Sequence, residues 1–223
     1  SGDEKAAVFA WGAGTALAAA ALRSSASTIG AVLLAASWLL MNVGFVWRPG
    51  DLPLAYPAIA VVLYVLSFWT RSVAARHLLL LSLSMFALLH YWSAATFVAP
   101  LLLVAASIAL VAFDHAQPAE ADRFLGLGSG LPVQALVAFL TGIGIMQVEL
   151  HDTAEFAIVS AAALVGIVAF LLFRGRRNAL LRWIAYAAFV FQLCFVYVVM
   201  LGSMLGTAGF FVVGGLALSL LAW

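Results

Sequence analysis

Residues 78–113 read LLLLSLSMFALLHYWSAATFVAPLLLVAASIALVAF and contain no Asp, Glu, Lys or Arg. A membrane-spanning helix needs about 20 mainly apolar residues, so this stretch is too long for a single span. Tyr91, Trp92 and Ser93 stand near its middle and are typical of a turn at the membrane surface. The stretch therefore predicts two consecutive transmembrane helices.

The rest of the chain has the same character. Of its 223 residues, 66% are hydrophobic and 9% are charged. Lipid offers the backbone no hydrogen-bond partner, so a spanning chain must form helices or a closed barrel. A barrel alternates polar and apolar residues in segments of about 10, whereas this chain has continuous runs of Leu, Ala, Val and Phe. We therefore expect an all-α polytopic transmembrane helix bundle, with residues 1–223 forming one transmembrane domain.

Turn and charge clusters divide the chain into about nine spans, whose ends are uncertain by roughly 2–4 residues. The predicted spans are 6–22, 28–47, 53–70, 77–92, 95–113, 131–148, 154–173, 179–201 and 204–223. Gly202 and Ser203 separate the last two. The chain begins without Met and ends at Trp223 without a polar tail, so we expect it to be part of a longer protein.

The basic residues support this division. If nine spans alternate in direction, one side of the membrane holds only Lys5 and Arg48. The other side holds Arg23, Arg71, Arg76, Arg123, Arg174, Arg176, Arg177 and Arg182. Because Lys and Arg are enriched in cytoplasmic loops, we expect the N-terminus outside and the C-terminus in the cytoplasm. The run Arg174–Arg177 attracts anionic lipid at roughly 1 kcal/mol per basic residue, so membrane lipids are expected partners. The net charge of +1 indicates no nucleic-acid partner.

The four histidines are candidate haem ligands. His77 and His90 lie near opposite ends of the fourth predicted span, with His115 and His151 in the connectors on the corresponding sides. A b-type haem iron can be held by two imidazoles, so these two pairs suggest a di-haem electron carrier. However, His115 and His151 lie in connectors rather than on a rigid facing helix. We therefore favour histidines with polar tips at the membrane surface, and we expect no cofactor.

An acidic cluster on the outer side is a candidate metal site. It contains Glu149, His151, Asp152 and Glu155. Carboxylates together with imidazole can hold a divalent metal, and residues four apart share a helical face. The favoured interpretation is a solvated loop in which Asp152 or Thr153 caps the next span and Glu155 is stabilised by the helix dipole.

No charged residue lies near the centre of a predicted span. Because intramembrane charges mark proton relays, ion pathways and ligand counter-ions, this absence argues against a proton-coupled pump, a rhodopsin and a voltage sensor. Isolated polar side chains usually bond across helices, but they can also line a path for a neutral solute. The candidate path residues are Asn42, Tyr64, Thr141, Tyr186 and Gln192.

Glycines mark two further segments. The sequence Gly126-Leu-Gly-Ser-Gly130 predicts a flexible linker before Pro132 begins a helix. Gly202 and Gly206 are four apart in the last apolar region, a spacing typical of close helix packing. The spacing of Gly202 and Gly206 therefore predicts that this part of the chain contacts another membrane protein or a second copy of the chain.

The last 27 residues read YVVMLGSMLGTAGFFVVGGLALSLLAW, from Tyr197 to Trp223. This segment resembles the end of a family of bacterial inner-membrane proteins described only as a domain of unknown function. The resemblance implies many Leu- and Ala-rich spans in the bacterial inner membrane. It implies no activity, cofactor or catalytic residue.

These observations favour a non-enzymatic integral membrane protein that serves as a structural or accessory subunit or as a membrane scaffold. A transporter or channel for a neutral or lipid-like solute is the alternative. The di-haem electron carrier is the second alternative.

Overall fold

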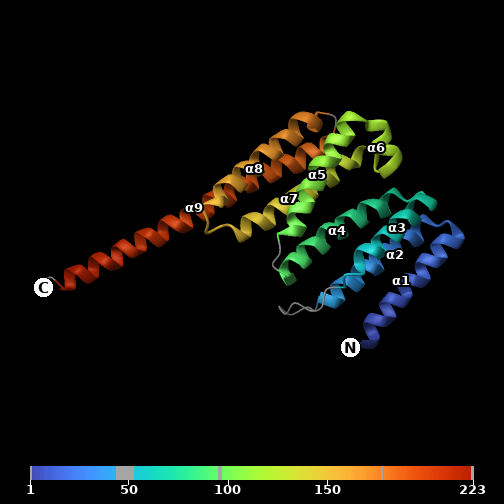
Figure 1. Ribbon diagram of the computed structural model, residues 1–223, viewed down its shortest axis with the longest axis horizontal. Coiled ribbons are helices and arrows are strands. Elements are labelled where there is room, and N and C mark those ends of the chain that lie inside the picture. The colour runs from blue at the N-terminus through green and yellow to red at the C-terminus, as the bar shows by residue number, and fades with distance from the viewer. Residues whose placement is uncertain (1, 44–52, 95–96, 177, 222–223) are drawn as a thin grey trace. The chain divides into compact units, whose positions relative to one another are not determined.

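The computed structural model describes residues 2–43, 53–94, 97–176 and 178–221. All regular secondary structure in these residues is helical (Figure 1). The α-helices are α1 (Gly2–Leu22), α2 (Ser25–Val43), α3 (Tyr56–Trp69), α4 (Val73–Ala94), α5 (Val98–Ala116), α6 (Pro118–Leu125), α7 (Leu131–Glu149), α8 (Glu155–Phe170) and α9 (Ala179–Leu221). A short 3-10 turn, Gly128–Gly130, precedes α7, and a π-helical turn, Leu171–Gly175, follows α8.

Seven helices within the described residues are long and apolar enough to cross a membrane. They are Glu4–Leu22, Ser25–Asn42, Val73–Trp92, Val98–Ala116, Gly128–Glu149, Glu155–Gly175 and Ala179–Gly202. The apolar helix α3 has 14 residues and is about 21 Å long, shorter than the roughly 30 Å of a hydrocarbon core. The prediction of an all-helical, polytopic membrane protein is confirmed.

One predicted boundary is wrong. The sequence suggested a turn at Gly202 and Ser203, but α9 continues through both residues to Leu221 and has 43 residues. A glycine within a helix costs only about 1 kcal/mol relative to alanine, and it keeps its backbone N–H. Gly202 and Ser203 therefore do not end the helix, and the eighth and ninth predicted spans form one continuous helix.

The chain divides into two compact units, Ser1–Val148 and Glu149–Trp223. Each contains helices of membrane-spanning length. The prediction of a single transmembrane domain stays a prediction.

The core of the first unit lies between α2, α3 and α4. Val32, Leu39, Leu63 and Leu79 are among its buried side chains. Helix α1 packs on α2 through small residues, since a Cβ built on Gly12 would lie 3.5 Å from the Cβ of Leu34. Small residues let membrane helices approach closely, so α1, α2 and α3 can surround a narrow space.

The second unit pairs α8 with the first half of α9. Val159, Ala163 and Ile167 are buried and recur at four-residue spacing on α8, so they form one face of the helix. The rings of Phe156 and Phe195 meet edge to face, with centroids 6.1 Å apart. Helix α9 begins after Asn178, whose side-chain oxygen accepts a hydrogen bond from the backbone N–H of Leu181 at 3.0 Å.

Candidate functional site

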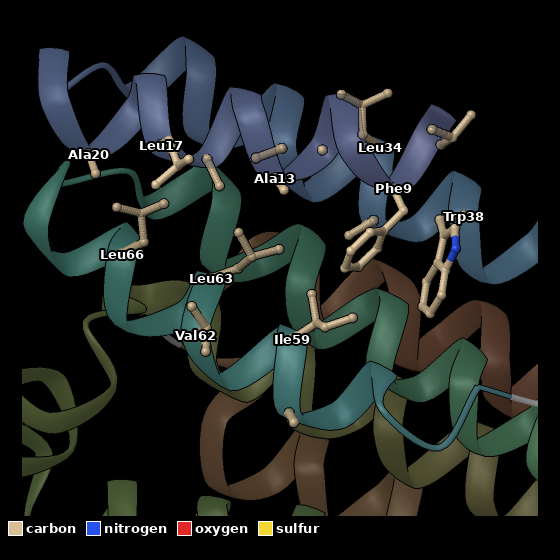
Figure 2. A pocket seen from close by; sticks show the side chains of 16 residues that line it. Phe9, Ala13, Leu17, Ala20, Leu34, Trp38, Ile59, Val62, Leu63 and Leu66 are labelled. Carbon is tan, nitrogen blue, oxygen red and sulfur yellow. The ribbon is translucent and has the colours of Figure 1, made fainter. Parts of the chain in front are cut away.

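An apolar groove of about 570 Å³ lies between α1, α2 and α3 (Figure 2). Its 16 lining residues are all Gly, Ala, Val, Leu, Ile, Phe or Trp. The volume lies within the range of about 300–1,000 Å³ that is usual for small-molecule sites. No side chain in the lining carries a charge, a hydroxyl or an amide, so the groove suits an apolar occupant.

Small side chains on α1 create the groove. Gly12, Ala16 and Ala20 line it at four-residue spacing, which places them along one face of the helix. Larger side chains of α3, among them Ile59, Leu63 and Leu66, lie across the groove from α1 (Figure 2). Because Gly12, Ala16 and Ala20 have little or no side chain, they leave an open groove along this face of α1.

The groove is open at its side. Leu63 is buried and lies deep in the unit, whereas Leu17 and Val62 are 73% and 66% exposed. Leu17 lies on α1, which is long and apolar enough to cross a membrane, so a side chain exposed there would meet lipid rather than water. An occupant can thus enter the groove laterally from the bilayer.

The two ends of the groove differ in chemistry. At one end, the rings of Phe9 and Trp38 pack with centroids 5.3 Å apart. At the other end, the indole N–H of Trp69 donates to the backbone carbonyl of Ala20 at 3.1 Å, and the guanidinium of Arg23 lies 4.2 Å from the Trp69 ring centroid. The apolar groove therefore ends beside a cation.

Hydrogen bonds hold two arginine-bearing turns together at this end. The Ser25 hydroxyl donates to the Ser72 hydroxyl at 3.0 Å, and the Thr28 hydroxyl donates to that of Thr70 at 2.8 Å. These bonds join the turn that contains Arg23 to the turn that contains Arg71. The two connectors that the charge pattern predicts on one side of the membrane thus lie side by side.

The glycine-rich segment 126–130 packs near the same end of α3 and the start of α4. Gly126 has φ +59°, and the Arg76 guanidinium donates to its carbonyl. The Tyr64 hydroxyl donates to the carbonyl of Leu125 at 2.8 Å. A Cβ built on Gly126 would overlap Arg76, and one built on Gly130 would overlap the His77 ring. This segment is a packed turn, whereas its composition predicted a flexible linker.

The predicted solute-path residues do not line the groove. Asn42 and Thr141 bond to carbonyls of their own helices, Trp38 and Val137. Tyr64 bonds to Leu125, as described above. Tyr186 and Gln192 belong to the second unit, where Tyr186 is 50% exposed and Gln192 is 5% exposed. The groove in the first unit is thus formed by apolar residues and not by the predicted path residues.

The candidate haem ligands have separate surroundings. The Nδ1 of His77 lies 3.1 Å from the amide nitrogen of Gln134 on α7. The ring of His90 packs against Phe86, with centroids 6.1 Å apart. His115 lies in the last turn of α5, and His151 belongs to the second unit. The role of these histidines as haem ligands stays a prediction.

The predicted metal cluster contains one close pair. His151 Nε2 lies 3.0 Å from an Asp152 carboxylate oxygen, and both side chains are exposed. Glu149 ends α7 and Glu155 begins α8. Within the described residues, no group of three or more His, Cys, Asp or Glu side chains converges on a common point.

The predicted contact face on α9 consists of Gly202 and Gly206. A Cβ built on Gly202 would meet nothing within 4 Å. Gly206 lies among the residues whose side-chain surroundings are not described. Contact with a partner through these residues stays a prediction.

Sequence reasoning missed the groove because its lining carries no chemical motif. The signal that was available is the row of small residues along the first span, which predicts close helix packing. No known family, curated protein or solved structure matches the chain. The resemblance of residues 197–223 to bacterial inner-membrane proteins stays a prediction.

Proposed function

We propose that this membrane protein binds a lipid-like solute in the groove between α1, α2 and α3, as part of a transporter for such solutes. The apolar lining of the groove carries this proposal. A neutral polar solute would lose its hydrogen bonds to water there and find the indole N–H of Trp38 as the only side-chain donor of the lining, at a cost of roughly 2–7 kcal/mol per unpaired group. A hydrocarbon chain forms no hydrogen bonds with water, so its transfer into the groove carries no such cost.

The dimensions of the groove support this class of solute. Its lining on α1 extends from Val8 to Ala20, which corresponds to about 18 Å along the helix axis. This is slightly more than half of a hydrocarbon core of roughly 30 Å. One chain of a lipid, which reaches about half the thickness of a bilayer, would therefore match the groove in length and polarity.

We also propose the orientation that the charge pattern predicts. The end of the first unit that carries Arg23 and Arg71 would face the cytoplasm, and the membrane would be a bacterial inner membrane. The adjacency of the two arginine-bearing turns supports placing them on one side, and the positive-inside rule selects that side.

Filling the groove tests the proposed function. Ala13 lines the groove, whereas Ala18 is exposed on the same helix and does not line it. We expect purified wild-type protein to retain lipid in native mass spectrometry after detergent exchange. Ala13→Trp should lose this lipid, because the indole occupies the groove.

The matched control is Ala18→Trp, which adds the same side chain to α1 outside the groove. It should retain lipid as the wild type does. Equal retention by the two variants, or a wild type that retains no lipid, would contradict the proposal. A stoichiometric protein displaced by Ala13→Trp would instead support an accessory role for the groove.

A further inference from the structure

We infer that the Ala20 end of the groove recognises the phosphate of an anionic phospholipid through Arg23 and Arg71. This inference rests on the proposed function, because it assigns the headgroup of the molecule whose chain fills the groove.

The position of Arg23 is the first observation. Ala20 lines the groove and accepts the hydrogen bond from Trp69, while Arg23 stacks on the Trp69 ring. A chain lying in the groove would therefore bring its polar end to this guanidinium. Tryptophan is typical of the headgroup level of a bilayer, which is also where a lipid phosphate lies.

The backbone at the two arginines is the second observation. Arg23 has φ +49° and Arg71 has φ +53°, and they are the only non-glycine residues with positive φ in the described part of the chain. Each follows the end of a helix, where glycine is the usual residue in this conformation. Backbone strain at non-glycine positions is often retained at functional sites. Two adjacent turns therefore keep arginine where glycine would fit more easily.

The charge at this end is the third observation. Both arginines are exposed, and Arg23 contacts the face of the Trp69 ring. The guanidiniums can bind phosphate in a bidentate manner. The partial negative charge at the C-termini of α1 and α3 also favours cations at these two positions.

The test compares two lipids that differ only in the headgroup. Wild-type protein is exchanged into dioleoyl phosphatidylglycerol or dioleoyl phosphatidylcholine, and the retained lipid is counted by native mass spectrometry. Both lipids carry a phosphate, but the quaternary ammonium of phosphatidylcholine is repelled by the nearby guanidiniums, so we expect retention of the anionic lipid to exceed that of the zwitterionic lipid by about tenfold, or about 1.4 kcal/mol. The double variant Arg23→Gln/Arg71→Gln should lose this preference and still retain both lipids.

Two further variants separate recognition from folding and from general charge. Arg23→Gly fits the positive φ and removes the guanidinium, so it should fold and show a reduced preference. Arg123→Gln removes the same charge from an exposed residue of α6, outside the two arginine-bearing turns, and it should keep the preference. Loss of the preference in Arg123→Gln as well would indicate diffuse attraction and overturn the inference.

An unchanged preference in the double variant would also overturn the inference. In that case, loss of lipid by Ala13→Trp would leave the proposed function intact. A wild type that retains neither lipid would overturn both proposals together.

Discussion

The hydroxyl of Thr28, at the start of α2, donates a hydrogen bond to the hydroxyl of Thr70, at the end of α3, over 2.8 Å. Both residues are buried, with 0% and 6% exposure. Thr70 in turn donates to the carbonyl of Leu66 at 3.1 Å. This chain of hydrogen bonds joins two connectors that are more than 40 residues apart in sequence, and it holds the arginine-bearing end of the groove together.

Replacing Thr28 by valine should therefore destabilise the protein. The change keeps the shape of the side chain and removes the donor, so we expect a loss of about 1 kcal/mol in the free energy of unfolding. Titration with a denaturing detergent, followed by circular dichroism, measures this loss. Thr141→Val is the matched control, because the Thr141 hydroxyl bonds only to Val137 of its own helix. An equal effect of the two substitutions would show that the contact between Thr28 and Thr70 contributes nothing specific.

The packed turn at Gly126 gives a second prediction. Gly126→Ala places a Cβ against Arg76 at φ +59°. A left-handed conformation costs a non-glycine residue roughly 1–2 kcal/mol, so the variant should unfold at a lower detergent fraction than the wild type. Gly144→Ala is the control, since a Cβ there meets nothing within 4 Å and alanine favours the helix by about 1 kcal/mol. Equal stability of Gly126→Ala and the wild type would mean that the turn does not require glycine.

The proposed orientation predicts which residues can be labelled from each side of the membrane. Cys194 is the only cysteine in the chain, so Cys194→Ala provides a background without thiols. In that background, Ser24→Cys should react with a membrane-impermeant maleimide only after the cells are opened. Asp152→Cys should react in intact spheroplasts. The reverse pattern would show that the arginine-bearing end faces outward.

The sequence predicted the class of structure because composition and the pattern of apolar residues together determine it. A chain that is 66% hydrophobic cannot leave its backbone unpaired in lipid, and its continuous apolar runs favour helices over a barrel. The ends of α4, α5 and α7 were predicted to within a few residues, since tyrosine, tryptophan and charged residues mark those boundaries. The boundary at Gly202 failed because glycine is also tolerated within a helix.

Residue types alone did not reveal the candidate site. Asn42 and Thr141 were predicted to line a solute path because they are polar, but the side chain of each donates a hydrogen bond to a backbone carbonyl of its own helix. Ala13 and Ala16 carry no chemical signal and line the groove. A small side chain within a span creates space only if the neighbouring helix does not fill it, and this depends on the rotation and spacing of both helices.

The sequence by itself thus determined that the chain is a helical, polytopic membrane protein, because hydropathy acts locally along the chain. Only the tertiary structure decided that α1, α2 and α3 enclose an apolar groove and that Arg23 and Trp69 meet at its end. The physical reason is that both features depend on contacts between helices, where side-chain volume and hydrogen bonds from distant segments act together.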